Sequence, residues 1–212
     1  MKKKIMIVLI TCLMITTLVG PAMADTYSSY NSLKTHKTIN VDYKIVTRDT
    51  ASSTAVIAIH GGTIERETDE IASAVASQGG YDFYSFIGLK SGGSTLHITS
   101  TNFNEPTARN LVAKSTKTLS IHGCGGTSQA ITYVGGLDTT LGNKVKSSLK
   151  AAGFKVASAP SSLGGQARTN ICNSNSIHKG VQLELSSTMR TQLANNGKSF
   201  DLYVTTLANA LK

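Results

Sequence analysis

The chain has 212 residues, of which 40% are hydrophobic and 16% charged, and its formal net charge is +9 at pH 7. This length suits one domain with a sizeable hydrophobic core. The lysines and arginines are scattered rather than clustered among aromatic residues, which argues against nucleic acid as a partner. Three cysteines are too few for a disulfide framework, and no internal repeat or low-complexity tract is present.

The first 24 residues have the pattern of a secretory signal peptide. Three lysines at residues 2–4 precede an apolar run at residues 5–19, and Ala22 and Ala24 form an A-x-A cleavage site. The run is shorter than the roughly 20 residues that a membrane span needs. We therefore predict cleavage after Ala24 and secretion of a chain without stable membrane insertion.

Removal of residues 1–24 takes away three lysines and no acidic residue, which lowers the net charge from +9 to +6. A moderately basic secreted protein favours an acidic polymer or an anionic cell wall as its partner over nucleic acid. General solubility explains the same charge equally well.

Downstream of a polar arm at residues 25–42, the sequence predicts strands and helices that alternate to residue 212. The continuous apolar run at residues 54–59 is typical of a strand buried on both faces. Other strands are expected near residues 43–47, 81–89, 95–101, 118–121, 154–157 and 181–186, with a possible hairpin turn at residues 91–94. Helices are expected near residues 68–79, 105–112, 141–152, 188–194 and 199–210. This alternation predicts one α/β domain at residues 43–212 with a mixed, mostly parallel sheet.

Three of the predicted strands end in, or contain, a side chain that can bind a metal or transfer a proton. His60 and His122 each follow an apolar strand and precede a glycine, and Glu184 lies within the last strand. In open α/β sheets, ligands gather beyond the carboxyl ends of the strands. Glu65 follows His60 by five residues, and so short a loop can fold back until both side chains face one ion.

His60, Glu65 and His122 would form a set of two histidines and one carboxylate, which suits a single zinc ion and leaves a position open for water. Zinc in such a site activates water and polarises a carbonyl. Glu184 is the candidate general base, because a carboxylate on an otherwise apolar strand is costly without a partner or a task.

Each of these residues also has a simpler interpretation. A histidine after a strand is more often a satisfied core or turn residue than a metal ligand. Glu65 could be an acidic residue favoured at a helix N-terminus. Glu184 could face solvent, since it alternates with Val181, Leu183 and Leu185 as on a half-exposed strand. The hypothesis of a metal site therefore depends on all four features together.

Four motifs occur in a definite order, at residues 58–65 (AIHGGTIE), 120–123 (SIHG), 170–173 (NICN) and 180–186 (GVQLELS). They resemble the metal-binding segment, the second histidine segment and the C-terminal signature of the poly-γ-glutamate hydrolase family of phages and bacilli. The resemblance runs from about residue 43 to the end of the chain, and the last motif is its most specific part.

This resemblance implies a three-layer α/β/α sandwich similar to zinc carboxypeptidases. It implies one zinc ion on His60, Glu65 and His122, with Glu184 as general base. It also implies cleavage of γ-glutamyl amide bonds in poly-γ-glutamate, an acidic polymer with one free carboxylate per residue.

The C-terminal signature also supplies candidate substrate-binding residues, Asn170 and Asn173. The family often has an arginine shortly after its second asparagine, whereas residues 174–179 of this chain contain none and offer Lys179 or His178 as the nearest cationic group. Arg168 could instead hold a glutamate carboxylate by a bidentate contact, with a solvated surface arginine as the alternative. Asparagines in loops often serve only local backbone hydrogen bonds.

Three further residues stay open to more than one interpretation. His97 could contact substrate or lie at the surface. Cys124 and Cys172 could form a disulfide or remain as free thiols, because their spacing does not say whether they are neighbours. Cys124, two residues after His122, could also ligate zinc, but the histidines and Glu65 already complete a ligand set.

Two functions compete with a poly-γ-glutamate hydrolase. A zinc-dependent peptidoglycan amidase would use a similar histidine and glutamate set, although the signature around Glu184 argues against it. A non-catalytic module that binds a polyanion would not need all four residues of the predicted site. The oligomeric state is not determined by the sequence, and we assume a monomer.

Overall fold

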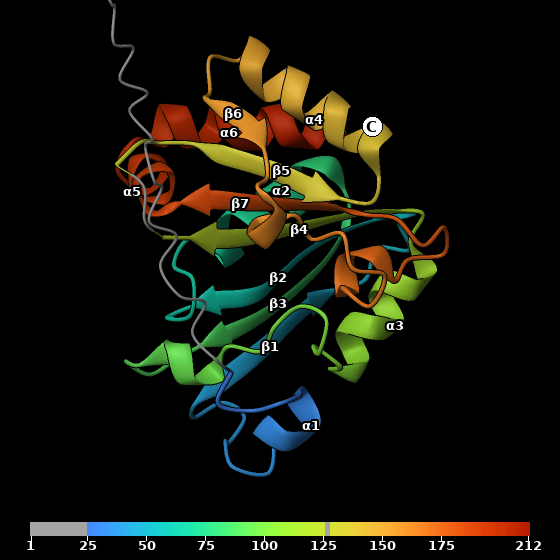
Figure 1. Ribbon diagram of the computed structural model, residues 1–212, viewed down its shortest axis with the longest axis vertical. Helices are drawn as coiled ribbons and strands as arrows, with labels where there is room; N and C mark the ends of the chain where they lie inside the picture. Colours follow the sequence, from blue (N-terminus) through green and yellow to red (C-terminus); the bar gives the residue numbers. More distant parts are fainter. Residues whose placement is uncertain (1–24, 126–127) are drawn as a thin grey trace, which may run out of the picture.

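The structure is a computed structural model that describes residues 25–125 and 128–212. The predicted signal peptide at residues 1–24 lies outside the described residues. The described chain forms a seven-stranded sheet with the strand order β1-β3-β2-β4-β7-β5-β6 (Figure 1). The strands are β1 (Tyr43–Arg48), β2 (Thr54–Gly62), β3 (Asp82–Gly88), β4 (Lys117–Cys124), β5 (Thr132–Gly136), β6 (Val156–Ser158) and β7 (Val181–Ser186).

The centre of the sheet is parallel and its edges are not. β3, β2, β4 and β7 run parallel to one another. β1 pairs antiparallel with β3 at one edge, and β5 pairs antiparallel with β7 while running parallel to β6 at the other. The predicted mixed, mostly parallel sheet is confirmed. The carboxyl ends of β2, β4 and β7 therefore meet at one end of the sheet.

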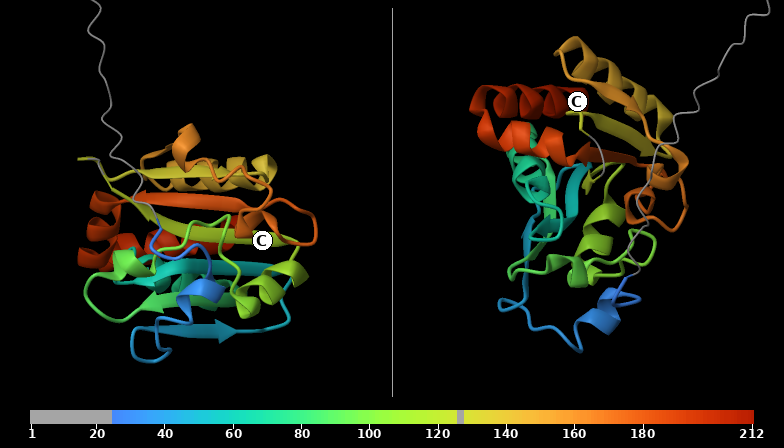
Figure 2. Two further views of the ribbon diagram at one scale, coloured as in Figure 1. Left: turned by 60° about the horizontal axis from the view of Figure 1, so that its bottom comes forward. Right: turned by 60° about the vertical axis from the view of Figure 1, so that its left-hand side comes forward.

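Helices cover both faces of this sheet, which gives three layers (Figure 2). One apolar cluster joins the sheet to α2 (Thr68–Gly79), α4 (Thr139–Ala151), α5 (Ser187–Asn195) and α6 (Gly197–Ala210). A second cluster on the opposite face involves α1 (Tyr30–Leu33) and α3 (Pro106–Lys114). No helix within residues 25–125 and 128–212 has the length and apolar character needed to cross a membrane. The expected α/β/α sandwich is confirmed.

Local sequence explains where the main elements begin and end. β2 buries its first eight residues, as expected for a central strand covered on both faces. α3 begins with Pro106 in its first turn, and the Glu105 carboxylate accepts hydrogen bonds from the backbone N–H groups of Thr107 and Ala108. α2 ends at Gly80, whose φ of +66° is the left-handed conformation that closes many helices.

The strands of the structure differ from the predicted strands in two places. Residues 95–101 form no strand. The 3-10 helix η1 (Gly93–Leu96) covers their beginning, and the alternating Leu96 and Ile98 are both buried in the second cluster, which explains their strand-like pattern. β5 is a strand that the sequence pattern does not predict, because it has only five residues and ends in two glycines.

The polar arm at residues 25–42 is packed against the sheet. α1 places Tyr30 and Leu33 in the second apolar cluster, and the Tyr30 ring meets the Phe86 ring edge-on at a centroid distance of 6.3 Å. A helix of four residues is too short to show a period in the sequence, so it is not predicted. The packing of this arm brings Asp25 beside the site described next.

Candidate metal centre

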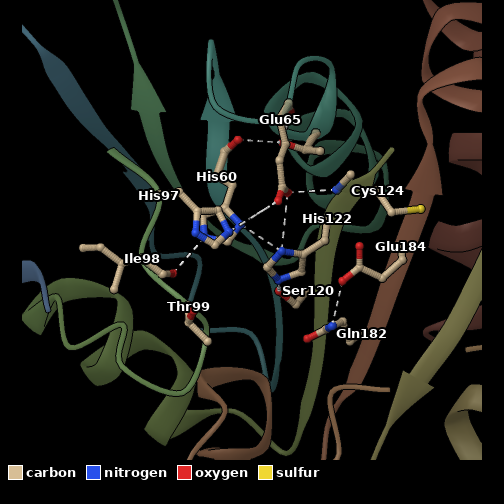
Figure 3. Close-up of polar contacts among 12 residues, drawn as sticks. His60, Glu65, His97, Ile98, Thr99, Ser120, His122, Cys124, Gln182 and Glu184 are labelled. Carbon is tan, nitrogen blue, oxygen red and sulfur yellow. Dashed lines mark hydrogen bonds and ion pairs between the residues drawn. The ribbon is translucent and has the colours of Figure 1, made fainter. Parts of the chain in front are cut away.

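Three predicted site residues converge at the carboxyl ends of neighbouring strands (Figure 3). His60 lies near the end of β2, His122 near the end of β4, and Glu65 in the loop between β2 and α2. His60 Nδ1 lies 3.0 Å from Glu65 Oε1 and 3.1 Å from His122 Nδ1, and His122 Nδ1 lies 3.5 Å from Glu65 Oε2. Among the described residues, these three side chains form the group whose ligand atoms lie close enough to hold one metal ion.

The loop that carries Glu65 turns back because of its glycines. Gly62 has a φ of +65°, and a Cβ there would lie 2.3 Å from the carbonyl oxygen of Gly88. The Glu65 N–H then donates to the carbonyl oxygen of His60 at 2.8 Å. The Gly62 N–H donates to the Asp69 carboxylate, also at 2.8 Å, which ties the loop to the start of α2.

Hydrogen bonds to the far nitrogens of both imidazoles leave their Nδ1 atoms facing Glu65. His60 donates its Nε2–H to the carbonyl oxygen of Ile98 at 2.9 Å, and a carbonyl can only accept. His122 Nε2 lies 2.9 Å from the Ser120 hydroxyl, which can accept in the same way. Two imidazoles that are both neutral would point two Nδ1 lone pairs at one another, an arrangement that a cation between them stabilises. Burial by itself would lower the pKa of His60, but the Glu65 carboxylate outweighs it and raises this pKa, so that a proton on His60 can take the place of such a cation.

The Glu65 carboxylate has the charge that such a cation needs. Burial by itself would raise the pKa of the Glu65 carboxyl, but His60 and His122 outweigh it and hold this pKa well below its ordinary value. The Gly123 N–H also donates to Glu65 Oε2 at 2.8 Å, which orients the carboxylate. Two imidazole nitrogens and one ionised carboxylate fit a zinc ion.

Glu184 lies beside this group on the adjacent strand. In the parallel register of β4 and β7, His122 is paired with Glu184 and Ser120 with Gln182. All six residues of β7 are buried, so Glu184 faces a protein cavity and not open solvent. Burial, together with the nearby Glu65 carboxylate, raises the pKa of Glu184 well above its ordinary value. The site thus holds two carboxyl groups whose pKa values are shifted in opposite directions, as in many acid–base sites.

A short hydrogen-bonded chain orients the Glu184 carboxyl. Asn170 donates its side-chain N–H to Gln182 Oε1 at 2.8 Å, which sets the direction of the Gln182 amide. Gln182 Nε2 then donates to Glu184 Oε1 at 2.9 Å. Asn170, proposed from the sequence as a substrate-binding residue, therefore also positions Glu184 through Gln182.

These residues line a cavity of about 630 Å³ that we call the catalytic cavity. Its charged or chargeable lining consists of Glu65, Glu184 and three histidines, His60, His97 and His122, besides the Cys124 thiol. Among the described residues that line it, none is lysine or arginine. The side chain of the nearby Arg190 is used elsewhere, since it donates to the carbonyl oxygens of Arg66, Cys124 and Leu185.

His97 joins the site from a loop and is held by the N-terminal arm. Its ring stacks on the His60 ring at a centroid distance of 4.1 Å, and its Nε2 lies 3.9 Å from Glu65 Oε1. Its Nδ1 lies 2.7 Å from Asp25 Oδ1, while Asp25 Oδ2 accepts a hydrogen bond from the Thr99 N–H at 2.6 Å. Asp25 thus forms hydrogen bonds with the residues on either side of Ile98, and the carbonyl oxygen of Ile98 accepts the hydrogen bond from His60.

The other three predicted substrate-binding residues lie outside the catalytic cavity. Asn173 is buried and donates to the carbonyl oxygens of Gly165 and Ala167 while accepting from the backbone N–H of Leu137 and Gly180. His178 is exposed on a turn with a φ of +56°. Arg168 lines a neighbouring cavity of about 480 Å³. A role for these residues in binding substrate stays a prediction.

Both described cysteines are free and buried. Cys124 ends β4, and burial close to Glu184 raises the pKa of its thiol to about 11. Cys172 is enclosed in the 3-10 helix η3 (Ile171–Asn173) before β7, and burial raises the pKa of its thiol to about 12. Of the two interpretations left open by the sequence, the structure has the free thiols.

Ser120, Gln182 and Asp25 are contributors that the sequence prediction did not name. Ser120 and Gln182 each precede a predicted site residue by two positions on a strand, so they lie on the same face as His122 and Glu184. Period-two spacing is a signal that could have identified them. Asp25 lies 72 residues from His97, and nothing in the sequence pairs the two.

Comparison with known proteins gives a consistent set of relatives. The family model for poly-gamma-glutamate hydrolase matches residues 27–208. The SPbeta prophage-derived protein YoqZ of Bacillus subtilis (strain 168) is 41% identical over 175 residues, which are 81% of this chain and 62% of YoqZ. The protein YndL of the same strain is 36% identical over 172 residues, covering 80% of this chain and 67% of YndL. The chain thus spans less than two thirds of YoqZ.

Two solved structures have the same fold. A bacteriophage poly-gamma-glutamate hydrolase matches with a TM-score of 0.85 at 34% identity, over 88% of this chain and 96% of the phage chain. Zinc-free YndL matches with a TM-score of 0.80 at 30% identity, over 89% of this chain and 98% of that chain. Sequence and fold agree, and the chain belongs to the poly-gamma-glutamate hydrolase family.

Proposed function

We propose that the protein is a secreted, zinc-dependent hydrolase that cleaves γ-glutamyl amide bonds of poly-γ-glutamate. The observation that carries the proposal is the convergence of two histidine Nδ1 atoms and the Glu65 carboxylate beside the buried Glu184. Membership of the poly-gamma-glutamate hydrolase family supports the substrate. The related YndL structure is described as zinc-free, which supports zinc as the metal.

In this proposal His60, Glu65 and His122 hold one zinc ion. Zinc bound by such ligands polarises a carbonyl and makes water a better nucleophile. The Ile98 carbonyl keeps the His60 imidazole in the tautomer that presents Nδ1, and the Ser120 hydroxyl can do the same for His122 when it accepts from Nε2–H. The Gly123 N–H keeps Glu65 Oε2 in place. The chain therefore orients its ligands before any metal is bound.

Glu184 moves the proton in this reaction. Its raised pKa suits a group that accepts a proton from the attacking water and later returns it to the leaving amine. The Gln182 amide occupies Oε1, so Oε2 is the oxygen available for this transfer. Asn170 keeps Gln182 from rotating and so preserves the direction of the carboxyl group.

The test is chain shortening of purified poly-γ-glutamate with zinc and with a chelator. We expect the protein to shorten the polymer with zinc, to stop with the chelator, and to resume when zinc is restored. No shortening at any zinc concentration would overturn the proposal. Peptidoglycan serves as the comparison substrate, and release of muramyl peptides without action on the polymer would instead support a cell-wall amidase.

Secretion is proposed from the basic, apolar and A-x-A pattern of residues 1–24. The expected product of cleavage begins at Asp25. Expression in a bacillus host, followed by N-terminal sequencing of the protein in the medium, tests this. Retention of the full-length chain in the cell fraction would contradict it.

A further inference from the structure

The residues that line the catalytic cavity do not by themselves explain how an acidic polymer is bound. Its lining contains Glu65 and Glu184 and no lysine or arginine. Poly-γ-glutamate carries a free carboxylate on every residue, and a single zinc ion on His60, Glu65 and His122 would offset charge only at the bond that is cut. The carboxylates of the other residues need cationic groups that this lining does not supply.

The neighbouring cavity of about 480 Å³ has the opposite composition. Arg109, from α3, and Arg168, from the loop before η3 (Ile171–Asn173), both line it, and its lining contains no aspartate or glutamate. Neither guanidinium forms a hydrogen bond or a salt bridge with another residue that the structure describes. Serine, threonine and asparagine side chains make up most of the remaining lining. We call this the arginine cavity.

The arginine cavity and the catalytic cavity adjoin. Thr101 lines both. Ala167 and Asn170 line the catalytic cavity, and their chain neighbours Arg168 and Ile171 line the arginine cavity. An extended chain that leaves the catalytic cavity over Thr101 therefore enters the cavity that both arginines line.

We propose that the arginine cavity is a binding subsite for α-carboxylates of the polymer, away from the bond that is cut. This rests on the proposed function and extends it to substrate recognition. The planar guanidinium groups of Arg109 and Arg168 each present paired N–H donors that match a carboxylate. Longer substrates reach this subsite and short ones do not, so it makes the enzyme selective for polymer length.

The test compares single and double Arg109→Gln and Arg168→Gln variants with the parent, all loaded with zinc. For the polymer we expect KM to rise about fivefold to tenfold in the double variant, with kcat unchanged. For the shortest γ-linked oligomer that the parent cleaves, KM should stay the same. Arg168→Lys should fall between Arg168→Gln and the parent, because lysine keeps the charge and loses the bidentate contact.

A matched control separates a built subsite from general attraction of a polyanion. Lys144 and Lys150 are exposed on α4, across the sheet from the arginine cavity, and the double Lys144→Gln, Lys150→Gln variant loses the same charge. We expect its KM for the polymer to change less than twofold at physiological salt. Equal KM increases in both double variants, or an equal effect on the short oligomer, would overturn the subsite.

Binding without cleavage distinguishes this proposal from the proposed function. In a Glu184→Gln background the polymer is held and not cut, so its Kd can be measured directly. A weaker Kd after the two arginine substitutions supports the subsite, and an unchanged Kd overturns it. A parent that binds the polymer through these arginines and never shortens it would contradict the proposed function alone.

Discussion

The polar residues around the catalytic cavity come from two kinds of structure. On one side, the parallel strands β4 and β7 carry the polar residues. Ser120 and His122 lie on β4, and they are paired in register with Gln182 and Glu184 on β7. On the other side, His97 and Ile98 lie in a loop that Asp25 holds through two hydrogen bonds.

The difference shows how much each side depends on single side chains. On the strands, backbone hydrogen bonds and two apolar faces set every position, so no one contact decides where His122 lies. In the loop, the Asp25 carboxylate supplies two hydrogen bonds that join the N-terminal arm to the segment that contacts His60. One substitution there should loosen the metal centre without unfolding the sheet.

The largest expected effect comes from a strand residue. His122→Ala removes one of the proposed ligands, and we expect zinc content to fall from one ion per chain to near zero. Activity on the polymer should fall by more than the roughly 10²–10⁴-fold that loss of a general base costs. Metal analysis of the purified protein checks this, and a variant that kept its zinc would remove His122 from the ligand set.

Glu184→Gln should separate chemistry from metal binding on the same pair of strands. We expect kcat to fall by about 10²–10⁴-fold while zinc content stays at the parent value. Because a base must be ionised and burial raises the pKa of Glu184, the parent should lose activity as pH falls through a value above the ~4.3 of an ordinary glutamate. Full activity well below that pH would contradict this role.

Asp25→Asn tests the loop side of the comparison. The amide can still accept from Thr99, but its N–H₂ group turns toward His97 Nδ1 and reverses the donor and acceptor roles of that ring. We expect zinc affinity to fall about tenfold, the lower end of what residues supporting a metal ligand contribute. The control is Asp49→Asn, an exposed aspartate paired with Lys114, for which we expect no change.

Competition with a chelator gives the zinc Kd of these variants, and thermal unfolding shows that the fold is intact. Equal zinc affinity in Asp25→Asn and Asp49→Asn would mean that the arm is not part of the metal centre.

The smallest expected effect concerns the two cysteines, which are not joined by a disulfide. Cys124 ends the strand β4 and Cys172 lies in the 3-10 helix η3, and both thiols are free. A reducing agent should therefore shift the Tm by less than about 1 °C, whereas loss of a disulfide typically costs about 2–5 kcal/mol. Alkylation of the unfolded, unreduced protein should modify both residues, and protection of the pair would show a covalent link.

Much of the fold and half of the site follow from local pattern. Apolar runs predict β2 and β7, and glycines after His60 and His122 predict turns at the carboxyl ends of strands. A parallel sheet brings such ends together, so His60, Glu65, His122 and Glu184 could be expected as one group. The same patterns are misleading at residues 95–101, where alternate apolar residues are buried in a loop.

What the sequence by itself determined is most of the strands and the site residues at their ends, because periodicity and turn residues are local properties of the chain. Only the tertiary structure decided which strands are neighbours, and thereby that Glu184 faces the cavity beside His122. It alone placed Asp25 against His97, and the arginine cavity beside the catalytic cavity. Such contacts join residues far apart in the chain, and they depend on packing that no single segment encodes.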